Sequence, residues 1–297
     1  MTAAAAVDSF LDRRPALLGL AYRMLGSRSE AEDVVQDAWI RWDQYPHRDR
    51  VEQPGAFLMQ MVTRLCIDRY RAARNQREVY AGPWLPEPVI TPSHGPGQVA
   101  ESAQLLGMGI LHLMETLTPL ERAVFVLAEG FDYSAREIGE TVQRKEAHCR
   151  QLLRRARQKL AREGADPGAQ PAAEAPLKVV EALTRGDVSA LLVSLSPDVE
   201  LISDGGGKVA AASQPLSGLR AVTRFLQGIV RANEGQPLRV EPACINGAPG
   251  VLLWRDQQLD TVMVMEAEGD LIRRLYFVRN PEKLAGADPA DGRAFSV

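Results

Sequence analysis

The residues best suited to binding a charged partner lie at 144–162. This stretch holds eight Lys or Arg residues against one acid. Its apolar residues Cys149, Leu153, Ala156 and Leu160 recur at i, i+4, i+7 and i+11, which is one stripe of a helix. The other faces must then carry the cations, and a dense cationic face is typical of phosphate binding. A charge run alone usually means only a solvated surface.

The preceding residues make a DNA-binding interpretation several times stronger. A short helix is predicted over 134–141, capped by Ser134 and Glu137, and a turn of three or four residues separates it from the basic helix. This is the helix-turn-helix layout, in which the second helix enters the major groove. The predicted DNA contacts in this helix are Lys145, His148, Arg150, Gln151, Arg154 and Arg155.

A second pair of charged segments lies nearer the N-terminus. Residues 64–77 hold five Arg against Asp68, and the side chains predicted to read phosphates and base edges are Arg64, Arg71, Arg74 and Asn75. Residues 29–37 are acidic instead. Asp33 and Asp37 have no evident internal partner, so this helix is expected to offer an acidic face to a protein; complementation of the helix dipole is the simpler explanation for Glu30 and Glu32.

These segments must be positioned by two domains or three small ones, since the chain has 297 residues. Stretches rich in Pro and Gly at 78–100 and 164–176 read as linkers. They leave folded blocks at 1–77, 101–163 and 177–284, with a flexible tail at 285–297. The net charge of -3 averages over segments of opposite sign.

The first two blocks are predicted to be all-helical. Ser29 and Glu32 are predicted to cap a helix that runs to about Trp42, Pro54 to open another, and Thr118 with Glu121 to cap a third. The third block is predicted to be α+β, with helices over 177–195 and 217–232. An antiparallel meander is then expected from the β-rich runs 238–245, 251–255, 259–265 and 271–278.

Composition argues against several classes of protein. No apolar run approaches the ~18 residues of a membrane helix, and the start lacks the pattern of an export signal. The three Cys are far apart, which disfavours disulfides and a zinc site and favours the reducing cytosol. The four His lie outside the third block, which excludes a His-based metal site there, and no cofactor is expected, because the three glycines after Asp204 are not a GxGxxG motif.

Residues 29–39 resemble the helix of bacterial sigma factors that binds core RNA polymerase. Residues 57–74 resemble the promoter-melting helix that follows it, and residues 117–160 resemble sigma region four. The short chain is similar to the extracytoplasmic-function (ECF) group. Three further motifs, at 84–88, 204–208 and 280–284, resemble the signature of a subgroup with a SnoaL-like C-terminal extension.

The resemblance implies two all-α sigma domains, the second a helix-turn-helix, followed by an α+β SnoaL-like cone. It implies a cytoplasmic transcription-initiation factor, not an enzyme, that binds core RNA polymerase and promoter DNA. The polymerase contacts would be Glu32, Asp33, Gln36 and Asp37. The first block would read the minus-ten element and the helix-turn-helix the minus-thirty-five element. The C-terminal domain would regulate in cis through Trp84, Leu85, Pro86, Asp204, Gly205, Gly206, Gly207, Lys208, Asn280 and Pro281.

Two departures from the family pattern occur at the helix-turn-helix. The turn reads Val142-Gln143-Arg144 where a Gly is usual, and Lys145 stands where a Ser cap is usual. A cation at a helix N-terminus provides no cap and opposes the dipole, at a cost of about 1 kcal/mol. A DNA phosphate beside Lys145 would reverse that sign.

Two alternatives concern the third block, which could be a small-ligand sensor or an isomerase-like enzyme. Catalysis of that kind needs a carboxylate base in an apolar cavity. Asp204 is the obvious candidate, although Asp-Gly-Gly-Gly is also ordinary turn chemistry in a surface loop. Asp260, Glu266 and Tyr276 are further polar candidates on the predicted strands, and Trp84 is interpreted as an anchor in a groove.

Overall fold

The computed structural model describes residues 3–77, 79–92, 107–164, 174–232, 238–285 and 287. These residues form two compact units, each built from segments that are separate in sequence. The first unit combines residues 3–77 with 113–164, and the second combines residues 79–92 and 107–112 with the described residues from Glu174 onward. The predicted block 101–163 is therefore divided in the structure, because residues 107–112 pack with the C-terminal domain.

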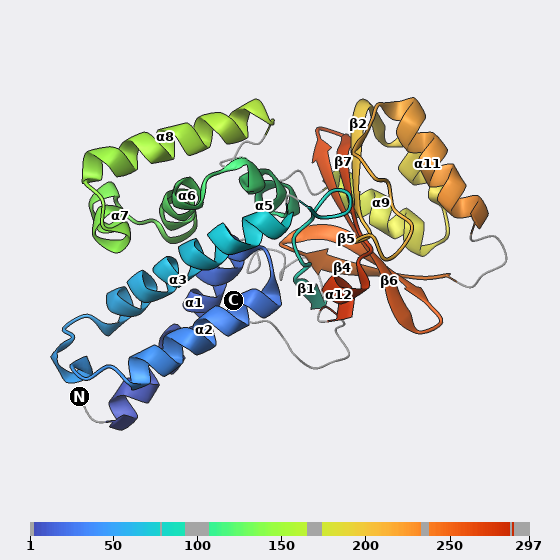
Figure 1. The fold of residues 1–297 in the computed structure, drawn as a ribbon. Helices are drawn as coiled ribbons and strands as arrows, with labels where there is room; N and C mark the ends of the chain where they lie inside the picture. Colours follow the sequence, from blue (N-terminus) through green and yellow to red (C-terminus); the bar gives the residue numbers. More distant parts are fainter. Residues whose placement is uncertain are drawn as a thin grey trace. The chain divides into compact units, whose positions relative to one another are not determined.

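The first unit begins with helices α1 (Ala3–Leu25), α2 (Arg28–Asp43) and α3 (Pro54–Arg77), with a 3-10 turn η1 (Arg48–Arg50) before α3. Each of the three helices packs on the other two (Figure 1). On α2, the buried positions Ala31, Val34, Val35, Ala38 and Trp42 form one helical face. The exposed residues of α2 are polar, apart from Ile40.

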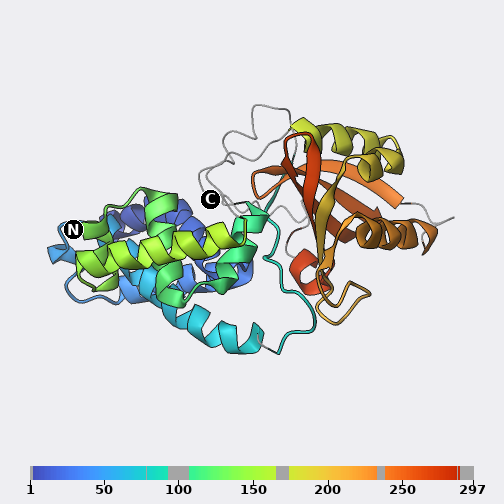
Figure 2. The ribbon, with the colours of Figure 1, turned by 90° about the horizontal axis from the view of Figure 1, so that it is seen from above.

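The first unit continues with η3 (Met114–Thr116), α6 (Pro119–Phe131), α7 (Ala135–Val142) and α8 (Glu146–Arg162). Both predicted capping boxes, at Thr118 with Glu121 and at Ser134 with Glu137, are confirmed. Helix α8 packs on α6 and α7, as Figure 2 illustrates from above. In the turn before α8, Gln143 adopts the left-handed conformation, with φ 54°, that Gly usually supplies.

The second unit is built on a seven-stranded sheet with the order β1-β4-β5-β6-β7-β2-β3. The strands are β1 (Ile90–Pro92), β2 (Leu195–Asp204), β3 (Leu216–Ser217), β4 (Leu238–Ile245), β5 (Ala248–Arg255), β6 (Gln258–Glu268) and β7 (Leu271–Val278). The helices are α5 (Met108–Leu113), which ends at the boundary with the first unit, then α9 (Glu174–Thr184), α10 (Val188–Val193), α11 (Leu219–Ala232) and α12 (Pro281–Ala285). The predicted meander β4 to β7 and the α+β class are confirmed.

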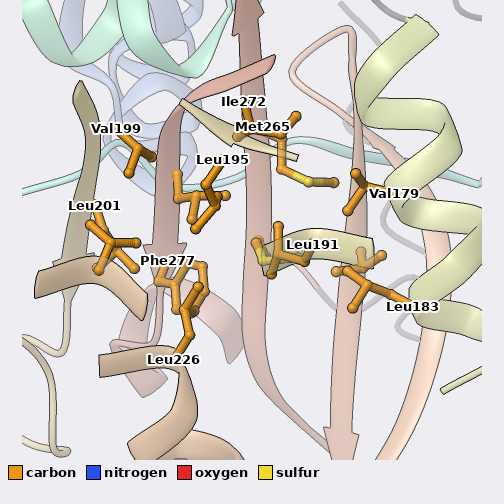
Figure 3. Close-up of a cluster of buried hydrophobic side chains, with 14 of the residues drawn as sticks. Val179, Leu183, Leu191, Leu195, Val199, Leu201, Leu226, Met265, Ile272 and Phe277 are labelled. Carbon is orange, nitrogen blue, oxygen red and sulfur yellow. The ribbon is translucent and has the colours of Figure 1, made fainter. Parts of the chain in front are cut away.

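One face of the sheet is covered by α9, α10 and α11. Figure 3 shows Val179, Leu183 and Leu191 from these helices packed against Met265 and Phe277 of the strands. Each such buried side chain stabilises the fold by about 1.5–3 kcal/mol. Side chains thus fill the space between the helices and the sheet.

The other face is covered partly by segments from outside the C-terminal block. Leu85 of the linker and Met108 of α5 are both buried among strand residues, together with Leu284 of α12. The sheet is therefore a two-sided core, and the linker provides part of its second cover.

Three details of the predicted elements are wrong. The cap of α2 is Ser27, whose Oγ accepts from Glu30 N at 3.2 Å, and not Ser29. The helix expected over 177–195 is two helices broken at Gly186, which has φ 81°. Leu195 opens strand β2, which was not predicted and which pairs in parallel with β7.

We predict that Ser27→Ala lowers the free energy of unfolding by about 1 kcal/mol, because the first turn of α2 loses its side-chain acceptor. Ser29→Ala is the matched control and should have a smaller effect, since Ser29 does not cap α2. Urea denaturation monitored by circular dichroism measures both. Equal effects from the two variants would contradict the assignment of the cap.

Candidate polymerase, promoter and linker-binding surfaces

The acidic residues predicted to contact polymerase form one exposed face of α2. Glu32, Asp33, Gln36 and Asp37 all point away from the buried face of the helix. Asp33, however, has an internal partner, because Arg69 of α3 donates to its Oδ2 at 3.0 Å, so the expectation of two unpaired aspartates is wrong. No ion pair within the described part of the chain involves Glu32 or Asp37. Glu32 and Asp37 are therefore the carboxylates on this face that are most available to a partner.

The cations of α8, the predicted recognition helix, fall into two groups. Arg157 and Lys159 are ion-paired with Glu129 and Glu121 of α6, at 2.6 Å in each pair, so these two cations hold the helix in place. Lys145, His148, Gln151, Arg154 and Arg155 are exposed and form no ion pair among the described residues, whereas Arg150 is paired with Glu146 one turn away. Lys145 makes no side-chain cap, as the sequence predicted.

The predicted DNA residues of α3 are less uniform. Arg64 is exposed, Arg71 is exposed but paired with Asp68 at 3.1 Å, and Arg74 is half-buried. The side chain of Asn75 lies outside the described residues. Tyr70, on the same helix, is fully buried and belongs to a different site.

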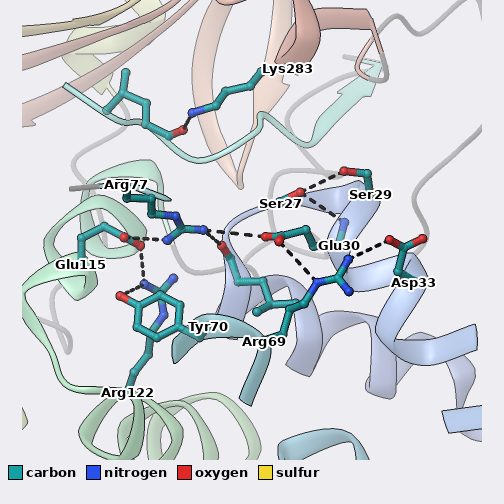
Figure 4. Close-up of polar contacts among 12 residues, drawn as sticks. Ser27, Ser29, Glu30, Asp33, Arg69, Tyr70, Arg77, Glu115, Arg122 and Lys283 are labelled. Atoms are coloured by element: carbon teal, nitrogen blue, oxygen red, sulfur yellow. Dashed lines mark hydrogen bonds and ion pairs between the residues drawn. The ribbon is translucent and has the colours of Figure 1, made fainter. Parts of the chain in front are cut away.

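That site is a buried charge cluster in the first unit (Figure 4). Arg122 of α6 has no exposed surface; it contacts Glu115 Oε1 at 2.5 Å, the Tyr70 hydroxyl at 3.1 Å and the Arg23 carbonyl at 3.1 Å. Arg77, from the end of α3, binds the other Glu115 oxygen at 2.6 Å. Both guanidinium groups also lie over the Tyr70 ring, at 4.6 and 5.3 Å. One carboxylate thus joins α3 to α6, the helix on which α7 and α8 pack.

The ionisation of Glu115 follows from these partners. Burial acts to raise the pKa of the Glu115 carboxyl, but the charges and hydrogen bonds of Arg122 and Arg77 outweigh burial and hold the pKa below its usual value. Glu115 therefore stays ionised in the folded chain at neutral pH. Local sequence patterns do not indicate this cluster, since its hydrogen-bonded pairs lie 38 or more positions apart except for Glu115 and Arg122.

In the second unit, the three signature motifs meet at one buried carboxylate. Asp204 has no exposed surface, which excludes the surface-loop interpretation. Its Oδ2 accepts from the Leu85 backbone N–H at 2.9 Å and from Lys283 Nζ at 2.6 Å. Its Oδ1 accepts from the Tyr80 hydroxyl at 2.7 Å and from the Gly206 N–H at 3.0 Å. Two of these donors come from the linker, so Asp204 binds the linker directly.

Lys283 completes the cluster from the third motif. Besides Asp204 it donates to the Leu85 carbonyl, and its ammonium lies 4.1 Å from the centre of the Trp84 ring and 5.1 Å from that of Tyr80. Asn280 donates to the Tyr80 hydroxyl at 2.8 Å. Trp84, the predicted anchor, thus makes a cation–π contact with the buried ammonium of Lys283.

The glycines of the second motif make room for these contacts. Gly206 and Gly207 have φ of 62° and 70°, a conformation that side chains disfavour. A Cβ on Gly206 would overlap the Asn280 side chain, and one on Gly207 would lie 2.8 Å from Ala81 of the linker. Lys208 lies outside this packing and pairs at the surface with Glu282.

Backbone hydrogen bonds also hold the linker on the C-terminal domain. Residues 90–92 add strand β1 to the edge of the sheet, with Ile90 opposite Ile245 of β4. Asn246 accepts from the Val89 N–H through its side chain at 3.1 Å and donates its own N–H to the Val89 carbonyl at 2.9 Å. The linker segment 80–92, held at both ends, is part of the C-terminal domain.

Helix α5 packs on the face of the sheet that Leu85 of the linker also covers. A Cβ on Gly109 would collide with the Glu266 carboxyl and with the Tyr276 hydroxyl, so a larger residue there would force these side chains to move. Burial raises the pKa of Glu266, against the opposing effects of Arg274 and Tyr276. His112 shares a 3.1 Å hydrogen bond with the Trp84 carbonyl and packs edge-on against Tyr276, so one of the four His does belong to this unit.

The arrangement gives little basis for catalysis. The Asp204 carboxylate is fully engaged by donors, and Glu266 faces α5 and Tyr276. Asp260 pairs with Arg279 at 3.2 Å. Within the described residues, no cluster of His, Cys, Asp and Glu could hold a metal ion, and no helix is long and apolar enough to cross a membrane.

Comparison with known proteins agrees with the sigma-factor resemblance of the sequence. The family model for Sigma-70 region 2 matches residues 10–76, and the model for Sigma-70, region 4 matches residues 107–160. The chain is 33% identical to the ECF RNA polymerase sigma factor SigJ of Mycobacterium tuberculosis, over 97% of this chain and 96% of the relative. It is 28% identical to a probable ECF RNA polymerase sigma factor, SigI, of the same species, over 91% of this chain and 92% of the relative.

A solved structure matches as well. The crystal structure of M. tuberculosis SigJ superposes with a TM-score of 0.74 at 29% identity and covers 95% of this chain and 99% of that one. Two helical sigma domains followed by an α+β sheet domain, the predicted fold class, are therefore confirmed.

We predict that Glu115→Gln lowers the free energy of unfolding of the first unit by about 3 kcal/mol at neutral pH, because Arg122 is left buried without a carboxylate. The folded-state pKa of Glu115 is lowered, so its stabilisation is complete above the unfolded pKa and is lost as pH falls through the folded pKa. The difference from wild type should shrink over that range. Glu140→Gln, at an exposed pair with Arg136, is the control in urea denaturation, and an equal effect of both variants would refute the buried cluster.

We predict that Asp204→Ala raises the rate of amide hydrogen exchange in the linker segment 80–92 at least tenfold, because the Leu85 N–H and Lys283 lose their acceptor. The sequence suggested that Asp204 and Lys208 act alike, but their burial differs. Lys208→Ala removes only a surface pair and should leave linker exchange unchanged. Unchanged linker exchange in a folded Asp204→Ala protein would contradict the role given to this carboxylate.

Proposed function

The chain belongs to the ECF sigma factors, and from that premise we propose that its C-terminal domain regulates promoter-specific transcription in cis by holding the linker between the two sigma domains. Sigma factors bind core RNA polymerase and promoter DNA. The proposal concerns which residues of this chain make those contacts and how the extra domain controls them.

The contacts with polymerase and promoter are assigned to separate faces. The exposed acidic face of α2, with Glu32, Asp33, Gln36 and Asp37, would meet core polymerase. The exposed cations of α8 would meet the minus-thirty-five element. The exposed face of α3 around Arg64 and Arg71, with Arg74 and Asn75, would meet the minus-ten element. Such a factor acts where polymerase acts, which for this chain implies the cytoplasm.

The observation that carries the regulatory proposal is the meeting of the three motifs at Asp204. The linker must span the distance between two promoter-bound domains, so its free length decides whether both can bind. Residues 80–92 are removed from that free length while Tyr80, Leu85 and Val89 are hydrogen-bonded to the C-terminal domain. Release of this segment would lengthen the tether, and its capture would shorten it.

The two alternatives have weaker support. A ligand sensor needs a cavity, and side chains from α9, α10 and α11 pack the inner face of the sheet. A groove of about 290 Å³ between α10 and α11 is the feature that favours this alternative. An isomerase-like enzyme needs an available base, whereas the Asp204 carboxylate is bound by the linker and Lys283.

We expect Tyr80→Phe to raise promoter output several-fold in reconstituted transcription. Deletion of the chain from Pro171 onward should change the output in the same direction. The hydroxyl is the smallest group whose loss weakens the grip of Asp204 and Asn280 on the linker. Tyr45→Phe, in the first unit, is the matched control. Asp37→Lys should abolish output by weakening core binding, which tests the sigma assignment separately.

Identical output from wild type, Tyr80→Phe and the truncated chain would refute cis regulation. If Asp37→Lys loses core binding in that same experiment, the proposed polymerase-binding surface on α2 is still supported.

A further inference from the structure

Helix α11 of the C-terminal domain carries an arginine stripe, defined as Arg220, Arg224 and Arg231 together with Gln227. The four residues are spaced by four, three and four positions, so they lie in line along one face of the helix. All four are exposed, while Val222 and Leu226 on the opposite face are buried in the core. The helix contains no acidic residue.

These arginines differ from the other cations of the domain. Residues 174–285 contain twelve Lys and Arg in the described positions, and eight of them are ion-paired within the domain. The four described cations without an ion pair are Arg185 and the three arginines of the stripe. Neutralisation by neighbouring acids is thus the rule in this domain, and α11 is the exception.

The stripe also opposes the stability of its own helix. Arg220 lies in the first turn, where a cation meets the positive end of the helix dipole. Arg220 and Arg224 form a like-charge pair at i, i+4, which disfavours a helix by about 0.2–0.5 kcal/mol. An anionic partner would reverse the sign of both effects, so the arrangement suits a bound polyanion better than a free surface.

We propose that the arginine stripe of α11 binds the phosphate backbone of duplex DNA, as a third and sequence-independent contact beside the two sigma domains. Planar guanidinium groups bind phosphates in a bidentate manner, and the Gln227 amide adds a neutral donor. From Arg220 to Arg231 the stripe spans about 16 Å, since a helix rises 1.5 Å per residue. That length matches about five phosphate steps along one strand.

The covalent connection makes this contact reachable. Helix α8 ends at Arg162 and α9 begins at Glu174, so the chain between them can span at most about 40 Å. A domain tethered so closely to a DNA-bound helix meets the same duplex at a high effective concentration, and three phosphate contacts then suffice. The inference therefore rests on the proposed binding of promoter DNA by α8.

The test uses the full-length chain and a random-sequence duplex, with affinity measured as a function of salt. The triple variant Arg220→Gln, Arg224→Gln, Arg231→Gln should reduce the slope of log K against log salt by about 2.7, or 0.9 for each lost phosphate contact. The matched control removes three other cations of the domain by Lys178→Gln, Arg185→Gln and Arg239→Gln, and should leave the slope within about 0.9 of wild type. Thermal stability of the triple variant should be unchanged or higher, which excludes unfolding as the cause.

A reduction of the slope by less than about 0.9, the contribution of one phosphate, overturns the proposal. An unchanged slope with weakened binding to core polymerase also overturns it and assigns the stripe to an acidic protein surface. Arg154→Gln, in α8, separates this inference from the proposed function. If Arg154→Gln leaves the slope unchanged, the proposed DNA binding by α8 fails; if Arg154→Gln reduces the slope and the α11 variant does not, the inference alone is overturned.

Discussion

A buried carboxylate must have its charge and its lone pairs satisfied by the protein, and at Asp204 this constraint organises the second unit. A desolvated charge without partners costs several kcal/mol, so Asp204 requires the linker N–H of Leu85, the Tyr80 hydroxyl and Lys283 together. These donors come from segments that are distant in the sequence. The C-terminal domain therefore reaches its described packing only with the linker in place, and the linker cannot leave without exposing or neutralising that charge.

In the first unit the buried charge is positive instead, and a carboxylate is its partner. Arg122 is buried; Glu115 neutralises its charge, and the Tyr70 hydroxyl accepts a hydrogen bond from it. Arg77, from the end of α3, shares the same carboxylate. In each unit, one carboxylate thus binds donors from segments that are distant in the sequence. Removal of one member leaves the others unsatisfied, so such clusters are kept or lost as a whole. The exposed arginines of α8 and α11 are the opposite case, because water solvates them and a partner can displace it.

Local signals in the sequence predicted local structure well. The capping boxes at Thr118 and Ser134 and the strands after Leu238 depend on residues within a few positions of each other, and all are confirmed. The helix-turn-helix and its exposed cations followed from charge and spacing. The errors have local causes too. Two serines competed to cap α2, and Ser196-Pro197-Asp198 resembles a turn, which concealed strand β2.

By itself the sequence determined the helical class of the first two blocks, the meander β4 to β7, the basic and acidic helix faces and the three motifs whose resemblance pointed to a sigma factor. Only the tertiary structure decided what those motifs do together. The partners of Asp204 are 119 and 124 positions away at Leu85 and Tyr80, and those of Arg122 are 52 positions away at Tyr70 and 99 at Arg23. Periodicity and caps reflect interactions over a few residues, whereas the burial of a charge is fixed by contacts that exist only after distant segments have packed.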